Sequence, residues 1–117
     1  MTETSDSLDE EILYLYHLPA IGSGYSNMYG EENIVNLVEK YRGLNDSGKA
    51  RMQEMVVGFS ESMDLSSSLV SVAVLHALGM EQAVHNAYRL ADDRDDAQSI
   101  KHHFDIGISI ADHFIRS

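Results

Sequence analysis

Hydrophobic positions recur at intervals of three and four along most of the chain, which is the spacing of one face of an α-helix. The first such run comprises Leu8, Ile12, Leu15 and Tyr16. Ser7 has the spacing of a capping box with Glu10, so Ser7 is predicted to cap this first helix. Pro19 ends the pattern, and the glycines between Pro19 and Gly30 predict a long loop.

Further runs with helical spacing follow near residues 31–42, 52–63, 69–78, 80–91 and 100–115. Gly43 and Gly79 stand directly after two of these runs, where glycine commonly ends a helix. Asp95 or Asp96 is expected to cap the last helix. The run over 69–78 is apolar on almost every face, which predicts a central helix surrounded by its neighbours.

A strand interpretation competes for two segments, residues 69–75 and 104–110. Hydrophobic and polar residues alternate from Phe104 to Ile110, as in a half-buried strand. The helical spacing continues to Ile115, however, and the chain has no Asn-Gly hairpin signal. We therefore predict an all-α fold, with one acidic helical domain over 1–117 that forms a bundle or irregular stack of about five to six helices in helical hairpins. An α+β fold is the alternative.

Charge is the strongest compositional feature of the chain. Its 117 residues include 19 Asp and Glu but only 8 Lys and Arg, which gives a net charge of −11, and the 44% of hydrophobic residues suffices for a core. This balance disfavours attraction to nucleic acid or to an anionic membrane surface. It predicts a basic protein partner and leaves the formation of homo-oligomers open.

The sequence predicts a cytoplasmic protein. It contains no cysteine, which excludes disulfides and fits a reducing compartment. Its first residues are acidic where a secretory signal would be basic. The longest apolar stretch, 69–78, has about half of the ~20 residues that a bilayer crossing needs.

Motifs for catalysis and for cofactor binding are incomplete. The segment 43–50 nearly matches a phosphate-binding loop, but Ala50 stands where that motif has a magnesium-binding hydroxyl. Asp6-Ser7-Leu8 matches the attachment triplet of acyl carrier proteins, without the helix and long loop that precede it there. No Gly-x-Ser-x-Gly elbow occurs. We therefore expect no enzyme, no catalytic residue and no cofactor.

A group of histidines and acids toward the end of the chain could form a metal site. They are His102, His103, Asp105, Asp112 and His113. On a helix, His102 and Asp105 lie one turn apart and can share an ion, but the spacing fixes no third ligand. We therefore predict a polar helix face without a metal, and a small metal-dependent hydrolase is the least favoured function.

Tyrosines within an acidic field indicate a protein-binding surface. Residues 1–32 contain several acids and no Lys or Arg. Tyrosine is a common interface anchor, and carboxylates steer a basic partner. A second acidic cluster follows the fifth helix, and the two clusters would act together if folding brought them to one side. The predicted contact residues are Glu10, Glu11, Tyr14, Tyr25, Tyr29, Asp92, Asp93, Asp95 and Asp96.

In size, acidity and helical-hairpin organisation, the chain resembles the immunity proteins that bacteria encode beside secreted or contact-delivered toxins of polymorphic systems. The resemblance implies a cytoplasmic antitoxin that binds its cognate toxin and blocks the active site. The chain lacks the Tyr-Tyr-Pro signature of the small colicin-nuclease immunity proteins, so no family residue is transferred. We therefore predict a stoichiometric protein-binding inhibitor. The alternative is a helical adaptor or regulatory subunit that docks a partner helix through exposed members of Met52, Met55, Met63 and Met80.

Overall fold

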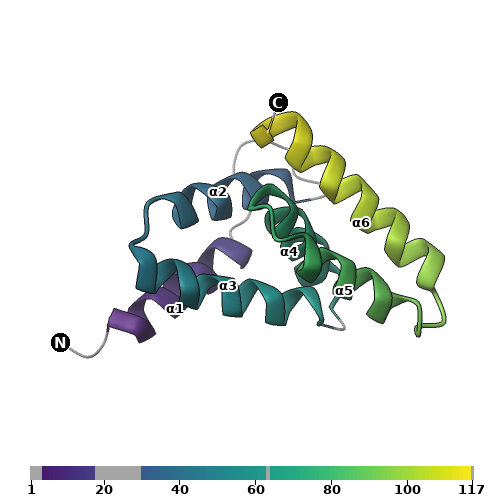
Figure 1. Cartoon of the computed structure of the whole chain (residues 1–117), viewed down its shortest axis with the longest axis horizontal. Coiled ribbons are helices and arrows are strands. Elements are labelled where there is room, and N and C mark those ends of the chain that lie inside the picture. Colours follow the sequence, from purple (N-terminus) through teal and green to yellow (C-terminus); the bar gives the residue numbers. More distant parts are fainter. Residues whose placement is uncertain (1–3, 18–29, 63, 117) are drawn as a thin grey trace.

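Helices make up almost all of the described chain (Figure 1). The structure, a computed structural model, describes residues 4–17, 30–62 and 64–116. In chain order the elements are α1 (Thr4–His17), α2 (Glu31–Arg42), α3 (Asp46–Ser60), α4 (Leu65–Ala77), α5 (Glu81–Ala91), α6 (Ala97–Ala111) and the π-helical turn η2 (Asp112–Arg116). The all-α prediction is therefore confirmed, and the bounds predicted for the second helix are those observed.

The alternative with strands at 69–75 and 104–110 is wrong, because these segments lie in α4 and α6. The buried residues of α6 show the reason. They are Ile100, Phe104, Gly107 and Ala111. Their spacing of four, three and four is that of one helix face, whereas Ile106, Ile108 and Ile110 lie on the flanks of this face and are only half-buried. The alternation is thus a short segment of a longer helical stripe.

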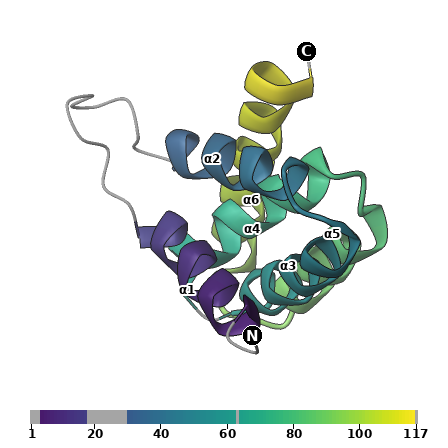
Figure 2. The same ribbon diagram turned by 90° about the vertical axis from the view of Figure 1, so that its left-hand side faces the viewer.

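The central position predicted for the fourth helix is confirmed. Every residue of α4 from Ser68 to Leu75 is buried. Among the described elements, α4 contacts α2, α3, α5, α6 and η2. Helices α1, α2 and α3 lie at one end of the molecule, which faces the viewer in Figure 2, and α1 packs on both α2 and α3. The fold is therefore organised around one apolar helix.

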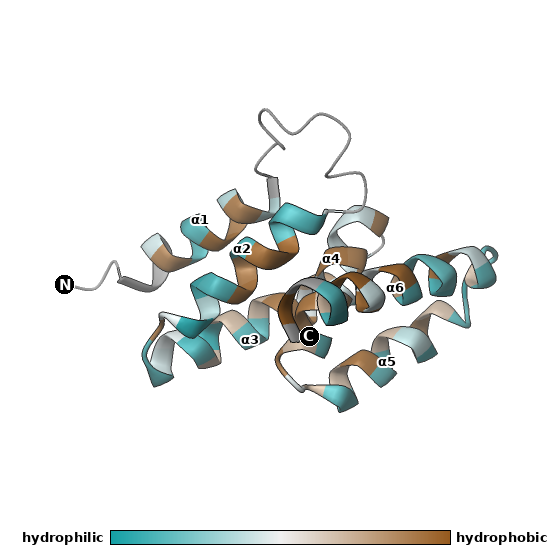
Figure 3. Cartoon of the chain, turned by 90° about the horizontal axis from the view of Figure 1, so that it is seen from above, coloured by the Kyte–Doolittle hydropathy of each residue, from teal (hydrophilic) through white to brown (hydrophobic). Residues whose placement is uncertain are grey.

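Two hydrophobic clusters meet at α4. The larger one joins α1, α2, α3 and the end of α6 to α4, with Ile12, Leu37 and Met52 fully buried in it. The smaller one lies between α4, α5 and α6, around Val72 and Phe104. Hydrophobic and hydrophilic residues alternate along α1, α2 and α6 in Figure 3, as expected of helices that each cover one side of a core.

Two helix ends follow the expected chemistry closely. After α4, Gly79 adopts a left-handed backbone with φ of 80°. Its N–H donates to the carbonyl of His76, and the N–H of Met80 donates to the carbonyl of Leu75, which is the hydrogen-bond pattern of a Schellman motif. Gly43 ends α2 as predicted, but with a right-handed backbone. Glycine is therefore conformationally required at Gly79 and not at Gly43.

Two predicted caps differ from the structure. Ser7 does not cap the first helix, because α1 already begins at Thr4 and Ser7 belongs to its first turns. Asp96 does occupy the N-cap position of α6, but its side chain makes no capping hydrogen bond. The N-caps of α3 and α4 are Asn45 and Asp64, whose side chains accept hydrogen bonds from backbone N–H groups of the first turn.

Candidate functional site

Helix α1 carries three consecutive carboxylates, Asp9, Glu10 and Glu11, and the structure gives them different roles. Successive residues of a helix are about 100° apart, so three neighbours cannot share one face. Ile12 is fully buried and fixes which side of α1 faces the core. Asp9 and Glu11 then lie at the two edges of that buried side, and Glu10 lies almost opposite Ile12.

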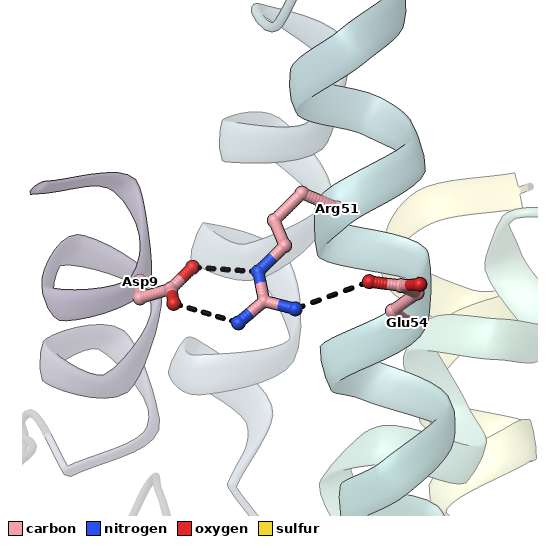
Figure 4. Close-up of polar contacts among 3 residues, drawn as sticks. All are labelled: Asp9, Arg51 and Glu54. Carbon is pink, nitrogen blue, oxygen red and sulfur yellow. Dashed lines mark hydrogen bonds and ion pairs between the residues drawn. The ribbon is translucent and has the colours of Figure 1, made fainter. Parts of the chain in front are cut away.

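Asp9 binds α1 to α3 through Arg51 (Figure 4). Arg51 Nε donates to Asp9 Oδ1 at 2.9 Å and Arg51 Nη2 donates to Asp9 Oδ2 at 2.7 Å. The third nitrogen, Nη1, donates to Glu54 Oε1 at 3.1 Å. The hydrogen bonds and charge of Arg51 hold the pKa of Asp9 below its ordinary value. This bidentate contact joins residues that are far apart in the sequence and sets where α1 lies on α3.

The other edge of α1 is held by α2. Glu11 forms an ion pair with Lys40. The buried Asn33 donates from Nδ2 to the carbonyl oxygens of Leu15 at 2.6 Å and of Tyr16 at 3.4 Å, where the last turn of α1 lacks helical partners. The Tyr16 hydroxyl also contacts the buried Ser71 hydroxyl of α4. Burial raises the pKa of Tyr16. These contacts fix the rotation of α1 and hence which side chains point outward.

The outward side of α1 carries an exposed tyrosine beside a carboxylate. Tyr14 is 63% exposed. Neither Tyr14 nor Glu10 has a hydrogen bond or ion pair with a described residue. A shallow hollow of about 370 Å³ lies here. We call its lining the Tyr14 face, which consists of Ser7, Glu10, Glu11, Tyr14 and Leu15. The sequence interpretation missed Ser7 and Leu15. Residues 7, 10, 11 and 14 are separated by three or four positions, which is the spacing of one helical stripe.

The second predicted acidic cluster lies elsewhere. Asp92, Asp93, Asp95 and Asp96 are in the turn between α5 and α6. Figures 1 and 3 place this turn and α1 at opposite ends of the long axis of the molecule. Asp92 is paired with Lys101 and Asp96 with Arg94. The two acidic clusters therefore lie at opposite ends of the molecule and not side by side. The remaining predicted residues, Tyr25 and Tyr29, lie outside the described residues.

Asp105 of α6 and Asp112 of η2 each contact a side chain of a neighbouring helix. Asp105 accepts a hydrogen bond from the Tyr88 hydroxyl at 2.6 Å, and the pKa of Tyr88 is raised by burial and by this carboxylate. His76 Nε2 lies 2.8 Å from Asp112 Oδ1. His102, Asp105 and His113 line an open hollow on the outer side of α6. Within the described ranges, no three histidines and acids are grouped so that they could hold a metal ion.

The methionines proposed for adaptor docking belong mainly to the core. Met52 is fully buried, and Met55 and Met80 pack against the larger hydrophobic cluster. Met63 lies outside the described residues. The packing of these side chains is that of core methionines, so the described part of the chain offers no exposed methionine face for a partner helix.

Comparison with models of protein families, with curated proteins and with solved structures finds no match for this chain. None of the helices over 4–17, 30–62 and 64–116 combines the length and the apolar character that a bilayer crossing requires. The functional interpretation therefore depends on the geometry and charge of the chain's own residues.

Proposed function

We propose that the chain is a stoichiometric protein-binding inhibitor that binds a basic partner through the Tyr14 face. The partner is a protein such as a cognate toxin, and the chain acts as a bacterial immunity protein in the cytoplasm, without enzymatic activity of its own. The observation that supports this most is the exposed Tyr14 next to Glu10 on a helix whose other contacts hold it in place.

Tyr14 has the properties of an interface anchor. A tyrosine offers a large contact area with only two side-chain torsions to order on binding. An aromatic side chain this exposed keeps apolar surface in water, which a partner would remove. The contacts of Asp9, Glu11 and Asn33 with their partners fix the orientation of α1. Tyr14 is therefore presented in one direction, and association requires little further ordering of the helix.

The charge of the chain favours a basic partner. The net charge is −11, and the acidic residues outnumber the basic ones at both ends of the described molecule. Electrostatic attraction by this negative charge raises the rate at which the chain encounters a protein rich in Lys and Arg, and the attraction weakens as the salt concentration rises. Glu10 adds a local carboxylate whose charge is not matched by any described residue. Binding by complementarity, rather than chemistry on a substrate, is what this surface supports.

An affinity capture from the native cell lysate tests the proposal. The baits are the wild-type chain, the double variant Glu10→Lys with Tyr14→Ala, and the control Asp93→Lys, which reverses one exposed charge in the α5–α6 turn. We expect one basic protein bound near one-to-one by the wild type and by the control, released by salt, and absent from the double variant. A partner retained equally by all three baits would exclude the Tyr14 face.

The inhibitor assignment needs a second measurement on the captured protein. Its activity is titrated with the purified chain. We expect activity to fall linearly and to end near one equivalent, because a tight stoichiometric inhibitor is consumed by its target. Activity that persists at saturation would show a binding protein that is not an inhibitor.

A further inference from the structure

The Tyr14 face combines three chemical features in one short stretch of helix. Glu10 and Tyr14 are four residues apart on α1, which places their Cβ atoms about 5–6 Å from each other. Leu15 supplies an apolar surface within the same hollow and Ser7 supplies a hydroxyl. An aromatic ring, a carboxylate and an apolar floor therefore line one open cavity of about 370 Å³.

We infer that this hollow receives an arginine side chain of the partner, with the guanidinium stacked on the Tyr14 ring and paired with Glu10. The inference rests on the proposed function and names the chemistry of the contact. A guanidinium is planar and weakly hydrated, stacks on aromatic faces, and forms two parallel hydrogen bonds with a carboxylate. The methylene groups of arginine can cover Leu15 while the charged end reaches Glu10.

The nearby cations of the chain are already engaged. Arg51 uses all three of its nitrogens on Asp9 and Glu54. Lys40 is paired with Glu11. These contacts satisfy the carboxylates on either side of Glu10. No described cation pairs with Glu10 or with the Tyr14 ring, so both are left for a cation from outside. The charge on this part of the surface therefore favours a cationic occupant over an acidic or purely apolar one.

Arginine is favoured over lysine because of Tyr14. A lysine ammonium can pair with Glu10, but it is strongly hydrated and lacks a flat surface for the ring. Stacking of a cation on an exposed ring contributes modestly, so we expect arginine to bind about two- to five-fold more tightly than lysine. A preference of this kind depends on the ring, whereas attraction by charge alone does not distinguish the two side chains.

Chemical-shift mapping by nuclear magnetic resonance tests the inference with defined probes. The probes are the peptides Gly-Arg-Gly-Arg-Gly-Arg-Gly and Gly-Lys-Gly-Lys-Gly-Lys-Gly, titrated at low salt into the isotope-labelled full chain. We expect both to shift the amide signals of residues 7–15, with the arginine peptide binding two- to five-fold more tightly. Tyr14→Leu should remove the preference for arginine, and Tyr14→Phe should keep it.

The outcomes separate the inference from the proposed function. Equal affinities of the two peptides at residues 7–15 would overturn the arginine contact and leave a basic partner on the Tyr14 face intact. Shifts confined to residues 92–96, or no shift in α1, would overturn both. Glu10→Gln should weaken both peptides, whereas the matched control Glu81→Gln, which removes one exposed charge from α5, should change neither; equal losses in the two variants would show attraction by net charge only.

Discussion

The close crossing of α4 and α6 at Gly107 predicts that Gly107→Ala destabilises the fold. A Cβ atom built on Gly107 would lie 2.9 Å from Leu69 Cδ1 and 3.2 Å from the backbone oxygen of Leu69. It would also lie 3.4 Å from Cβ of Ala73. The leucine side chain is buried and the carbonyl belongs to the central helix, so neither can withdraw freely. The two helices must therefore separate by a few tenths of an ångström.

Two opposing effects set the size of the change. Alanine is favoured over glycine inside a helix by about 1 kcal/mol. Overpacking a well-packed core costs about 1–3 kcal/mol. The net expectation for Gly107→Ala is a loss of about 1 kcal/mol, which lowers Tm by about 4 °C for a chain of this length.

Gly58 provides a matched control, because it is exposed in α3 and nothing lies within 4 Å of a Cβ built there. Gly58→Ala should raise the free energy of unfolding by about 0.5–1 kcal/mol from helix propensity alone. Urea titrations followed by circular dichroism at 222 nm measure both variants. The two should differ by about 1–3 kcal/mol, with Gly107→Ala the less stable. Equal stabilisation by both substitutions would refute the close crossing.

Other predictions follow from a backbone position and from two titrating groups. Gly30→Ala should lower Tm measurably, because φ is 75° and the new methyl group would meet a valine of α4, whereas Gly43→Ala should be nearly neutral; similar melting curves would contradict this. Arg51 lowers the pKa of Asp9, so this contact stabilises the fold above pH 3.8 and is lost as the pH falls further. Asp9→Asn should therefore be less stable at pH 7 than the wild type, and urea titrations at stepped pH should show the gap closing below pH 3.8; a constant gap would count against the contact. Burial raises the pKa of Tyr88, so the neutral Tyr88 side chain contributes its full stabilisation of the fold below pH 10, and this stabilisation is lost as the hydroxyl ionises at higher pH. Absorbance at 295 nm during alkaline titration should lose a late-ionising component in Tyr88→Phe, whereas loss of a component that ionises near pH 10 would place the hydroxyl in water.

Most of the fold could be predicted from local patterns. The stripe over 31–42 has acids in its first turn and bases in its last, and α2 has the same bounds. The all-apolar run around Val72 could only be buried on all sides, which made it the central helix. Helix ends were less predictable, because several polar residues near each end compete for the capping position. Thr4 and Ser7 illustrate this, since either is a plausible start for α1.

The candidate site could be predicted only in part. Glu10 and Tyr14 were recognised from charge and residue type, and the structure exposes both. Their neighbours Asp9 and Glu11 looked equivalent in the sequence, but tertiary contacts with Arg51 and Lys40 give them a structural role. Ion pairs between helices that are distant in the chain leave no periodic signal. The separation of the two acidic clusters depends in the same way on how the helices pack.

The association rate of the captured partner tests the central claim most directly. It is measured by stopped flow across a range of salt concentrations for the wild type, Glu10→Lys and Asp93→Lys. The Tyr14 face predicts that Glu10→Lys slows association strongly and flattens the salt dependence, while Asp93→Lys has a clearly smaller effect. Equal rates for the two variants, or a larger loss with Asp93→Lys, would contradict binding through the outward side of α1.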